Sequence, residues 1–352
     1  MSRFFDRKFE KLVPYVPGEQ PQDRKYIKLN TNESPFPPSA KAIAAAGEAA
    51  KNLNLYSDPE MRLLKGALAR TLGVDQDEIF VCNGSDEVLS FAFMALCPEG
   101  AAFPDVTYGF YEVFAALHGV PARKIPLRSD FTIDPEEYLS LRETVFIANP
   151  HAPTGILLSP GDVERILASS PDRLVVIDEA YIDFGGESCL GLIKNYDNLL
   201  VTRTFSKSRS MAGARLGFGV SCRAIINDLE TIKYSTNPYN VNSMTAAAGI
   251  GALADEEYTK SNCRYVIENR AYTEKGLKSL GFEVLPSGAN FLFARLPGSD
   301  GERLYRALKE RGILVRHFTS PRTKDFLRIT IGTKEQSNAL LDALAAITGK
   351  KQ

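Results

Sequence analysis

Five short runs of apolar residues stand out in the first two thirds of the chain. Each is four or five residues long and bounded by polar positions, a pattern typical of strands buried in a parallel sheet. The runs are Ile79–Cys82, Val145–Ala148, Leu174–Asp178, Leu199–Thr202 and Leu216–Val220. Helical patterns, such as those of residues 86–96 and 160–168, separate some of them. This alternation predicts an α/β domain around a mostly parallel sheet.

The chain before these runs has a different pattern. Within residues 1–38, prolines crowd the segments Leu12–Gly18 and Ser34–Pro38, which predicts an arm in place of a domain. A helix is clearly marked further on. Asp58, directly followed by a proline, is the expected N-cap, and Gly73 is the expected stop.

From about residue 242 the pattern changes again. A long helical run through Arg264–Leu280 leads into short strands and helices, and the last helix is expected over Lys334–Ile347. This order is typical of a smaller α+β domain. The length of 352 residues suits two cores. The expected division is an arm, a large domain and a small domain: residues 1–38, 39–245 and 246–352.

Composition and charge exclude several classes of protein. The 42 basic and 43 acidic residues give a net charge of −1, so no overall field attracts nucleic acid or an anionic membrane. The five cysteines are widely spaced and form no C-x-x-C pair, which argues against a disulfide framework and against a bound metal. No apolar run reaches the length of a membrane span, and the N-terminal segment lacks a signal-peptide core. We therefore expect a cytoplasmic protein.

Two of the apolar runs are followed by reactive side chains. Lys207 comes soon after the run that ends at Thr202, where desolvation disfavours the ammonium form and frees a nucleophilic amine. Asp178 ends the preceding run, and Tyr181 adds a phenol. Pyridoxal phosphate needs a lysine for its aldehyde and a carboxylate that keeps its ring nitrogen protonated. Taken singly, Lys207 could be a solvated loop residue and Asp178 a helix cap; their combination favours the cofactor.

A phosphate site is predicted where a strand meets a helix. The turn Asn83-Gly84-Ser85-Asp86 places backbone amides at a helix N-terminus, which favours an anion. The turn matches neither the P-loop nor the G-x-G-x-x-G pattern of nucleotide-binding proteins. Ser206 and Arg215 could add phosphate contacts. Tyr108 could lie flat against a pyridine ring or pack in the core.

Four motifs, in this order along the chain, resemble aminotransferases of the aspartate aminotransferase fold. They are Gly84-Ser85-Asp86, Asn149–Gly155 (Asn-Pro-His-Ala-Pro-Thr-Gly), Asp178–Tyr181, and Ser206-Lys207 with Arg215. The resemblance extends from the arm to Gly332. It implies fold type I of the pyridoxal phosphate enzymes, with a three-layer α/β/α large domain and a smaller α+β C-terminal domain.

Other segments narrow the resemblance to the histidinol-phosphate aminotransferases. They are Pro14-Tyr15, Asn52–Pro59, Gly312–Phe318 and Phe326–Thr333. The resemblance implies transamination of histidinol phosphate with 2-oxoglutarate in histidine biosynthesis, by a homodimer that binds small molecules and no nucleic acid or membrane. An aromatic amino acid aminotransferase and a threonine-phosphate decarboxylase are alternatives within the same fold. A non-catalytic sensor or regulator that binds pyridoxal phosphate would need a DNA-binding module, for which the arm is too short.

The resemblance also implies roles for individual residues. Lys207 would hold the cofactor covalently and serve as base and acid of a 1,3-proton shift, Asp178 would pair with the ring nitrogen, and Tyr181 would contact the phenolic oxygen. Tyr108 would stack on the ring. The residues expected to hold the cofactor phosphate are Gly84, Ser85, Thr204, Ser206, Arg215 and, from the other subunit, Tyr56. Asp86 is also expected to bind the cofactor. The residues expected to bind substrate are Tyr15, Asn290, Arg316 and Arg328.

One position departs from the family pattern. Ala152 stands where this fold usually has an asparagine that contacts the phenolic oxygen of the cofactor. Alanine cannot make that hydrogen bond. We expect His151 or Asn149 to contact the cofactor in its place, or a water to fill the position.

Overall fold

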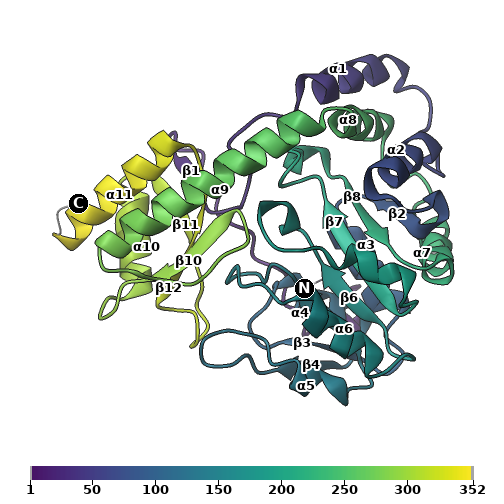
Figure 1. Ribbon diagram of the computed structural model, residues 1–352, viewed down its shortest axis with the longest axis horizontal. Helices are drawn as coiled ribbons and strands as arrows, with labels where there is room; N and C mark the ends of the chain where they lie inside the picture. The colour runs from purple at the N-terminus through teal and green to yellow at the C-terminus, as the bar shows by residue number, and fades with distance from the viewer. Residues whose placement is uncertain (1, 350–352) are drawn as a thin grey trace.

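The computed structural model describes residues 2–349, which form two sheets with their own helices (Figure 1). The larger sheet of this part of the chain has seven strands in the order β2-β8-β7-β6-β5-β3-β4. In that order they are Ile79–Cys82, Gly217–Val220, Leu199–Thr204, Val175–Asp178, Thr144–Ala148, Ala101–Pro104 and Ala122–Ile125. β8 is antiparallel to both of its neighbours, and the other neighbouring pairs are parallel. The predicted, mostly parallel sheet is confirmed.

Helices cover both faces of the large sheet. In β2, Ile79 and Val81 pack into one apolar core and Phe80 and Cys82 into another, because alternate side chains of a strand point to opposite faces. The first core includes side chains of α2 (Arg62–Leu72), α6 (Pro160–Ala168) and α8 (Ser243–Leu253). The second includes side chains of α3 (Ser85–Ala95), α4 (Phe110–His118) and α7 (Arg223–Thr236). This is the expected three-layer α/β/α arrangement.

The smaller sheet has the order β1-β11-β12-β10-β9. Its strands are Ile27–Leu29, Ile313–His317, Phe326–Thr330, Phe291–Arg295 and Glu283–Val284. Its apolar core includes side chains of α9 (Glu256–Ser279), α10 (Gly301–Glu310) and α11 (Lys334–Thr348). The long helix α9 runs from the end of α8 to this smaller unit (Figure 1). The predicted boundary between residues 245 and 246 falls inside α8 and stays a prediction.

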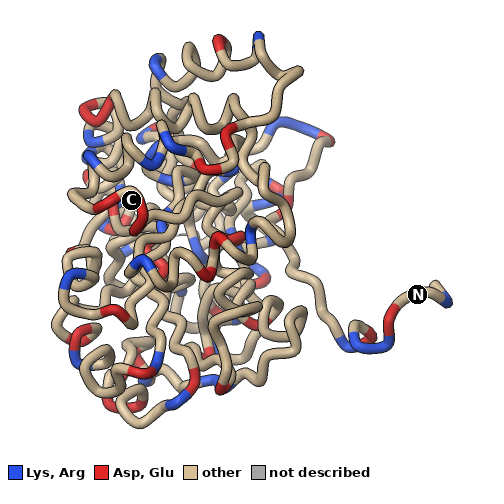
Figure 2. Tube along the Cα trace, turned by 90° about the vertical axis from the view of Figure 1, so that its right-hand side faces the viewer, with Lys and Arg blue, Asp and Glu red and all other residues tan. Residues whose placement is uncertain are grey.

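The remaining helices are α1 (Ala40–Ala49), which lies against α8, and the single turn α5 (Glu136–Leu139). The N-terminal segment extends away from the rest of the molecule (Figure 2). The arm then joins the smaller sheet, because β1 pairs in parallel with β11. The sequence did not predict this strand, which lies between the two proline-rich segments.

Several helix bounds agree closely with those predicted from the sequence, and one differs. The helix α6 has the predicted bounds, and Gly73 ends α2 with a left-handed φ of 70°. The helix α2 begins later than expected. The Asp58 carboxylate accepts hydrogen bonds from the backbone N–H groups of Glu60 and Arg62, both at 3.1 Å, and the left-handed Met61 (φ 51°) delays the start of the helix.

Two strands of the large sheet were not predicted. β3 contains two alanines and a proline, which carry little β-strand signal. β4 is an edge strand, and its first three residues are exposed. Unlike β2, the buried strand at the other edge, β4 therefore lacks the apolar run by which the buried strands were recognised.

Three further findings concern the distribution of charge, the helices and possible metal ligands. Basic and acidic residues are intermixed along the Cα trace (Figure 2). Within residues 2–349, no helix combines the length and the apolar character needed to cross a membrane. The same residues contain no group of three or more His, Cys, Asp or Glu side chains arranged to hold a metal ion.

Candidate active site

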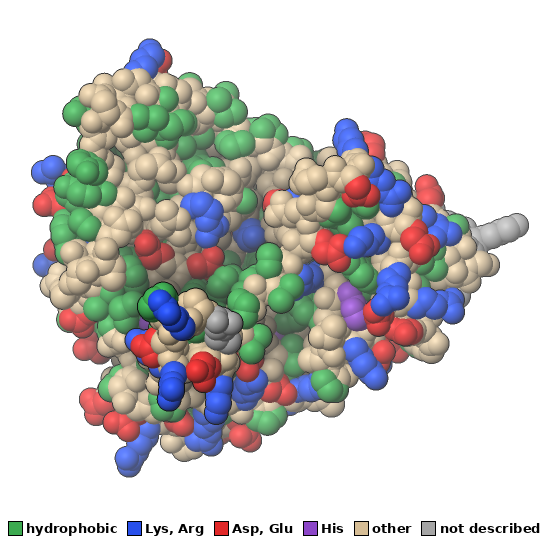
Figure 3. Space-filling model, turned by 180° about the vertical axis from the view of Figure 1, so that it is seen from behind, with side chains coloured by type: hydrophobic (Ala, Val, Ile, Leu, Met, Phe, Trp, Pro, Cys, Tyr) green, Lys and Arg blue, Asp and Glu red, His purple; other side chains and the backbone are tan. Residues whose placement is uncertain are grey.

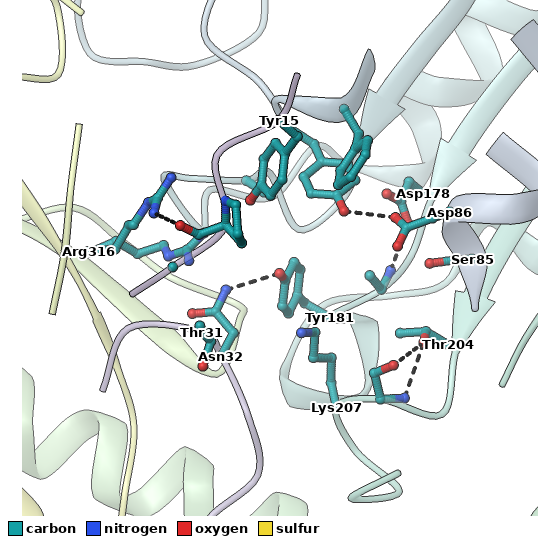
Figure 4. A pocket seen from close by; sticks show the side chains of 18 of the residues that line it. Tyr15, Thr31, Asn32, Ser85, Asp86, Asp178, Tyr181, Thr204, Lys207 and Arg316 are labelled. Carbon is teal, nitrogen blue, oxygen red and sulfur yellow. Dashed lines mark hydrogen bonds between the residues drawn. The ribbon is translucent and has the colours of Figure 1, made fainter. Parts of the chain in front are cut away.

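A cavity of about 330 Å³ lies where the arm and both sheets meet (Figure 4). The carboxyl ends of β6 and β7 and the N-terminus of α3 form one wall, and the arm with β11 and β12 forms the other. In open α/β sheets, ligands bind at such carboxyl ends. Among the described residues, its lining includes four basic side chains and two carboxylates: Lys207, Arg215, Arg316, Arg328, Asp86 and Asp178. The excess of positive charge favours an anionic ligand.

Lys207 follows β7, and its side chain reaches into the cavity beside Tyr181 (Figure 4). Its Nζ lies 5.8 Å from the centre of the Tyr181 ring. Burial, followed by the positive charge of Arg328, lowers the pKa of Lys207 to about 8. At neutral pH the lysine therefore has a much larger fraction of nucleophilic amine than an ordinary lysine.

Asp178 is the last residue of β6 and is only 4% exposed. Its carboxylate accepts hydrogen bonds from the hydroxyls of Tyr111 and Thr202 and from the backbone N–H of Ala180, each at 3.2 Å. Burial raises the pKa of Asp178 to about 6, and the charge of Asp86 adds to this effect. Among the described residues, Asp178 has no ion-pair partner. A cationic group on a ligand would stabilise its charged form.

Tyr181 lies three residues beyond Asp178 and lines the same cavity. Its ring meets Phe291 edge-on, with 5.1 Å between the ring centres. Its hydroxyl oxygen accepts a hydrogen bond of 3.0 Å from the side-chain amide of Asn32. Burial raises the pKa of Tyr181, so the phenol keeps its proton at neutral pH.

A cluster of hydrogen-bond donors lies around the N-terminus of α3. Ser85 opens this helix, and the hydroxyls of Thr204 and Ser206 lie 2.9 Å apart beside it in the cavity wall. Gly84 has a φ of +74°, and a Cβ there would lie 2.5 Å from Nη2 of Arg215, so glycine leaves room for the guanidinium. The first N–H groups of a helix lack partners within it. The cluster therefore suits a phosphate group.

The side chain of Asp86, from the same turn, is engaged by two neighbouring side chains, Arg215 and Tyr108. Its carboxylate pairs with Arg215 (3.0 Å) and accepts the hydroxyl hydrogen bond of Tyr108 (2.8 Å). Burial, and then the charge of Asp86, raise the pKa of Tyr108 well above its usual value. Asp86 thus orients an arginine and an aromatic ring, and its predicted contact with the cofactor stays a prediction.

The arm contributes Tyr15 to the cavity. The Tyr15 ring stacks on Phe110, with ring centres 4.3 Å apart. Arg316 from β11 holds this part of the arm in place, because its guanidinium donates to the carbonyl oxygens of Val16 (2.8 Å) and Pro17 (2.9 Å). Both predicted substrate-binding residues therefore line the cavity, on the side away from Ser85 (Figure 4).

Arg328 from β12 is the neighbour of Arg316 across the β11–β12 pair. Its Nη2 donates to the carbonyl oxygen of Asn30 at 3.1 Å. Its Nε is buried and has no hydrogen-bond partner among the described residues. Burial lowers the pKa of Arg328. A partly buried guanidinium with an unpaired N–H is suited to bind a carboxylate or phosphate ligand.

Two predicted cofactor contacts lie outside the cavity. The side-chain amide of Asn149 bonds to the backbone of Leu158, to which it donates at 2.9 Å and from which it accepts at 3.0 Å. The ring nitrogens of His151 bond to the Thr154 hydroxyl (2.7 Å) and the Val106 carbonyl (2.9 Å). Burial lowers the pKa of His151 to about 4. Neither side chain lines the cavity, and the expectation that one of them replaces the asparagine missing at position 152 stays a prediction.

Two other predicted residues are also placed elsewhere. Asn290 is 1% exposed and donates to the carbonyl oxygen of Asn32 at 3.0 Å, so it supports the arm and does not line the cavity. Its expected direct contact with substrate stays a prediction. Tyr56 is 83% exposed and stacks on Tyr239, with ring centres 4.4 Å apart. Its contact with a second subunit stays a prediction.

The structure adds residues that the sequence did not single out. They are Pro17, Gly18, Asn30, Thr31, Asn32 and Phe110 in the cavity lining, with Tyr111 and Thr202 behind Asp178. Thr202 could have been found, because Asp178 and Thr202 are direct neighbours in the β6–β7 register. For Asn32, the only local signal is the Asn-Thr-Asn sequence after a short apolar run.

Comparison with known proteins agrees with this geometry. The family model for aminotransferase class I and II matches residues 24–344. The histidinol-phosphate aminotransferase 2 of Dechloromonas aromatica is 49% identical over 356 residues, which cover 99% of this chain and 100% of that protein. The chain belongs to the histidinol-phosphate aminotransferases of this family.

Solved structures place this aminotransferase in the expected fold. The histidinol-phosphate aminotransferase from Sinorhizobium meliloti, solved in complex with pyridoxal-5'-phosphate, superposes with a TM-score of 0.89 at 26% identity and covers 99% of this chain and 98% of that chain. The aspartate aminotransferase from Thermotoga maritima has a TM-score of 0.81 at 23% identity, with 92% of each chain covered. The fold of the aspartate aminotransferases, expected from the motifs, is confirmed.

This aminotransferase is a pyridoxal phosphate enzyme, and the residues present fit the cofactor. The donor cluster at α3 suits its phosphate. Asp178 is a buried acid without a cationic partner and suits a protonated ring nitrogen. Lys207 supplies an amine with a lowered pKa in the same cavity. The cavity therefore offers a matching group for each reactive part of the cofactor.

Proposed function

We propose that this chain transfers the amino group of histidinol phosphate to 2-oxoglutarate, which gives imidazole acetol phosphate and glutamate in histidine biosynthesis. The chain shares 49% sequence identity with a histidinol-phosphate aminotransferase over the whole length of that protein, which supports this assignment. The observation that supports it best is that one cavity contains Lys207 and Asp178 together with the neighbouring guanidinium groups of Arg316 and Arg328.

The large-sheet wall of the cavity would hold pyridoxal phosphate. Lys207 would bind its aldehyde, Asp178 its ring nitrogen and Tyr181 its phenolic oxygen, while Tyr108 would stack on the ring. The residues that would hold the phosphate are Gly84, Ser85, Thr204, Ser206 and Arg215. When bound, the cofactor supplies an electron sink for the negative charge that develops on the α-carbon of the amino donor.

The side chains of the protein control where protons are held. The carboxylate of Asp178 would keep a proton on the ring nitrogen of the cofactor, since pairing with that cation would offset the cost of burying the acid. Nζ of Lys207 accepts the proton from the α-carbon of the amino donor. Its lowered pKa of about 8 keeps enough neutral amine at physiological pH for this task, and the protonated amine then serves as the acid.

The arm and the small sheet would bind the anionic ends of both substrates. Histidinol phosphate carries a phosphate, and glutamate carries two carboxylates. Arg316 and Arg328 are neighbours on adjacent strands, and planar guanidinium groups bind either kind of anion. Tyr15 closes this side of the cavity against Phe110 and helps to exclude water. An aromatic amino acid would use only one of these cationic sites, whereas phosphate and dicarboxylate substrates use the cluster.

We also propose that the active unit is a cytoplasmic homodimer. The exposed apolar side chains of Leu53, Leu55 and Tyr56 lie near α1 and α2, where Figure 3 shows hydrophobic side chains gathered. A second copy on this face would bury them and would bring Tyr56 to the partner's phosphate site. The five cysteines are unpaired, which suits a reducing compartment. Mixing Tyr56→Ala with Lys207→Ala tests the dimer, because hybrid dimers would regain one intact site.

The substrate assignment is tested with the cofactor-loaded enzyme and 2-oxoglutarate. Glutamate formation is measured with histidinol phosphate, histidinol, phenylalanine or threonine phosphate as the amino donor. We expect kcat/KM for histidinol phosphate to exceed that for histidinol by about 100-fold, because the phosphate bonds to charged groups. A preference for phenylalanine would assign an aromatic aminotransferase. Release of carbon dioxide from threonine phosphate would assign the decarboxylase.

A further inference from the structure

Asn32 lies where the arm, the small sheet and the large-sheet wall of the cavity meet. It follows β1 by three residues and is 1% exposed. Its φ of 54° lies in the left-handed region, which asparagine adopts more readily than most residues. Its side chain lines the cavity beside Tyr181 (Figure 4). The position is therefore tightly defined by both backbone and packing.

The hydroxyl of Thr330 determines which way the Asn32 amide points. Its Oγ1 accepts a hydrogen bond from the backbone N–H of Asn32 at 3.0 Å. The single hydroxyl proton of Thr330 is then donated to Oδ1 of Asn32, also at 3.0 Å. With its oxygen towards Thr330, the amide presents its NH₂ group to Tyr181, whose hydroxyl oxygen it meets at 3.0 Å. Tyr181 is thus the acceptor in this pair.

The small sheet holds this arrangement from behind. Asn290, at the start of β10, donates to the backbone carbonyl of Asn32 at 3.0 Å. The next residue, Phe291, pairs with Thr330 in the β10–β12 register and packs edge-on against the Tyr181 ring. Two neighbouring strands therefore fix both the backbone and the amide of Asn32. The same strands limit the movement of the Tyr181 ring.

We propose that Asn32 is a positioning residue that turns the hydroxyl proton of Tyr181 into the cavity, towards the phenolic oxygen of bound pyridoxal phosphate. The Tyr181 hydroxyl has one proton. Because its oxygen accepts a hydrogen bond from the Asn32 NH₂ group, Asn32 offers no acceptor for that proton. Ala152 lines the cavity without a polar side-chain atom, and the side chains of Asn149 and His151 are engaged elsewhere. The inference rests on the cofactor of the proposed function.

This arrangement has a measurable consequence for the cofactor spectrum. A donor on the phenolic oxygen stabilises its ionised form, so it lowers the pH at which the bound chromophore loses its proton. Other charged groups around this part of the cavity also influence the pH at which the bound chromophore loses its proton. They are Lys207, Arg215, Arg328, Glu33, Asp86 and Asp178. The test must therefore separate the hydrogen bond from a simple change of charge.

The experiment is a pH titration of the absorbance spectrum of the cofactor-loaded protein. Asn32→Asp keeps the shape and suits the left-handed backbone, but its carboxylate accepts the Tyr181 proton, so we expect the midpoint to rise by about one pH unit. Thr330→Val changes no charge and removes the hydroxyl that orients the amide, and we expect a rise of about half a unit. Thr330→Ser keeps the hydroxyl and is the matched control, with the parent midpoint.

The double variant with Tyr181→Phe decides whether the effect passes through the phenol. If it does, Asn32→Asp causes little further shift in the Tyr181→Phe background. An equal shift there would overturn the inference, because charge alone would then explain it. Midpoints that stay at the parent value in Asn32→Asp and Thr330→Val, with only the melting temperature lowered, would also overturn it. A parent protein that binds no pyridoxal phosphate would refute the proposed function itself.

Discussion

The two walls of the cavity are built in different ways. In the large-sheet wall, Asp178 ends a buried strand, and Ser85 and Lys207 follow others within a few residues. In the opposite wall, Arg328 of the small sheet donates a hydrogen bond to the carbonyl oxygen of Asn30 in the arm, 298 residues away in the chain. The first wall holds the residues assigned to chemistry, and the second holds those assigned to recognition.

The two walls also differ in the interactions that hold their functional groups in place. The backbone hydrogen bonds of β6 and β7 hold the reactive groups, so their relative positions follow from the register of one sheet. The recognition wall depends on side-chain bonds, such as those from Arg316 to the carbonyl oxygens of Val16 and Pro17. Changes in the first wall should mainly lower kcat, and changes in the second should mainly raise KM.

The largest effect is expected at the lysine. Lys207→Ala removes both the amine that binds the cofactor and the base, so we expect the rate of glutamate formation to fall by about 10⁴-fold. Mass spectrometry after borohydride reduction should find no cofactor attached to the variant. The exposed lysine variant Lys194→Ala is the control and should keep both properties. Covalent cofactor in Lys207→Ala would disprove the assignment.

A smaller loss is expected at the buried acid. Asp178→Asn keeps the shape of the side chain but removes the charge that holds the ring nitrogen protonated. We expect kcat to fall by about 10²–10³-fold, as for other electrostatic groups in active sites. Steady-state kinetics with histidinol phosphate measure this change, with the exposed Asp197→Asn as control. A kcat within a factor of two of the parent would contradict the role of Asp178.

Substitutions in the recognition wall, which contains Arg316 and Arg328, should mainly raise KM. Arg316→Lys and Arg328→Lys keep the positive charge but lose the planar pair of donors. We expect KM for histidinol phosphate to rise by about 10–100-fold in each variant, with a smaller change in kcat. The exposed Arg306→Lys on α10 serves as control. If kcat falls while KM stays constant, the division of labour between the two walls is wrong.

The smallest predicted effect concerns pH and couples the two walls. Burial and Arg328 lower the pKa of Lys207 from 10.5 to about 8, so its reactive neutral form increases as the pH rises through 8. The rate at which cofactor-free protein binds pyridoxal should be about fivefold higher at pH 8 than at pH 7. Removing the charge with Arg328→Gln should move the profile to higher pH. A parent midpoint near 10.5 would contradict the lowered pKa.

Local sequence predicted some parts of this protein better than others. The strands that lead to Cys82, Asp178 and Thr204 are continuous apolar runs because both of their faces are buried, and all were predicted. The edge strand β4 and the arm strand β1 lack that signal and were missed. His151 and Asn149 were expected in the cavity because they stand beside Ala152 in sequence. The turn directs both side chains into contacts of its own.

The sequence by itself predicted the α/β fold, the cofactor and the candidate reactive residues Lys207 and Asp178. It could do so because Asp178 ends one strand and Lys207 follows another, and the apolar pattern of each strand is local. Only the tertiary structure decided which groups surround them. The partnership of Asn32 with Thr330 and Tyr181 joins three segments that are remote along the chain. Hydrogen-bond direction depends on where each donor finds its acceptor in space, and no local pattern encodes that.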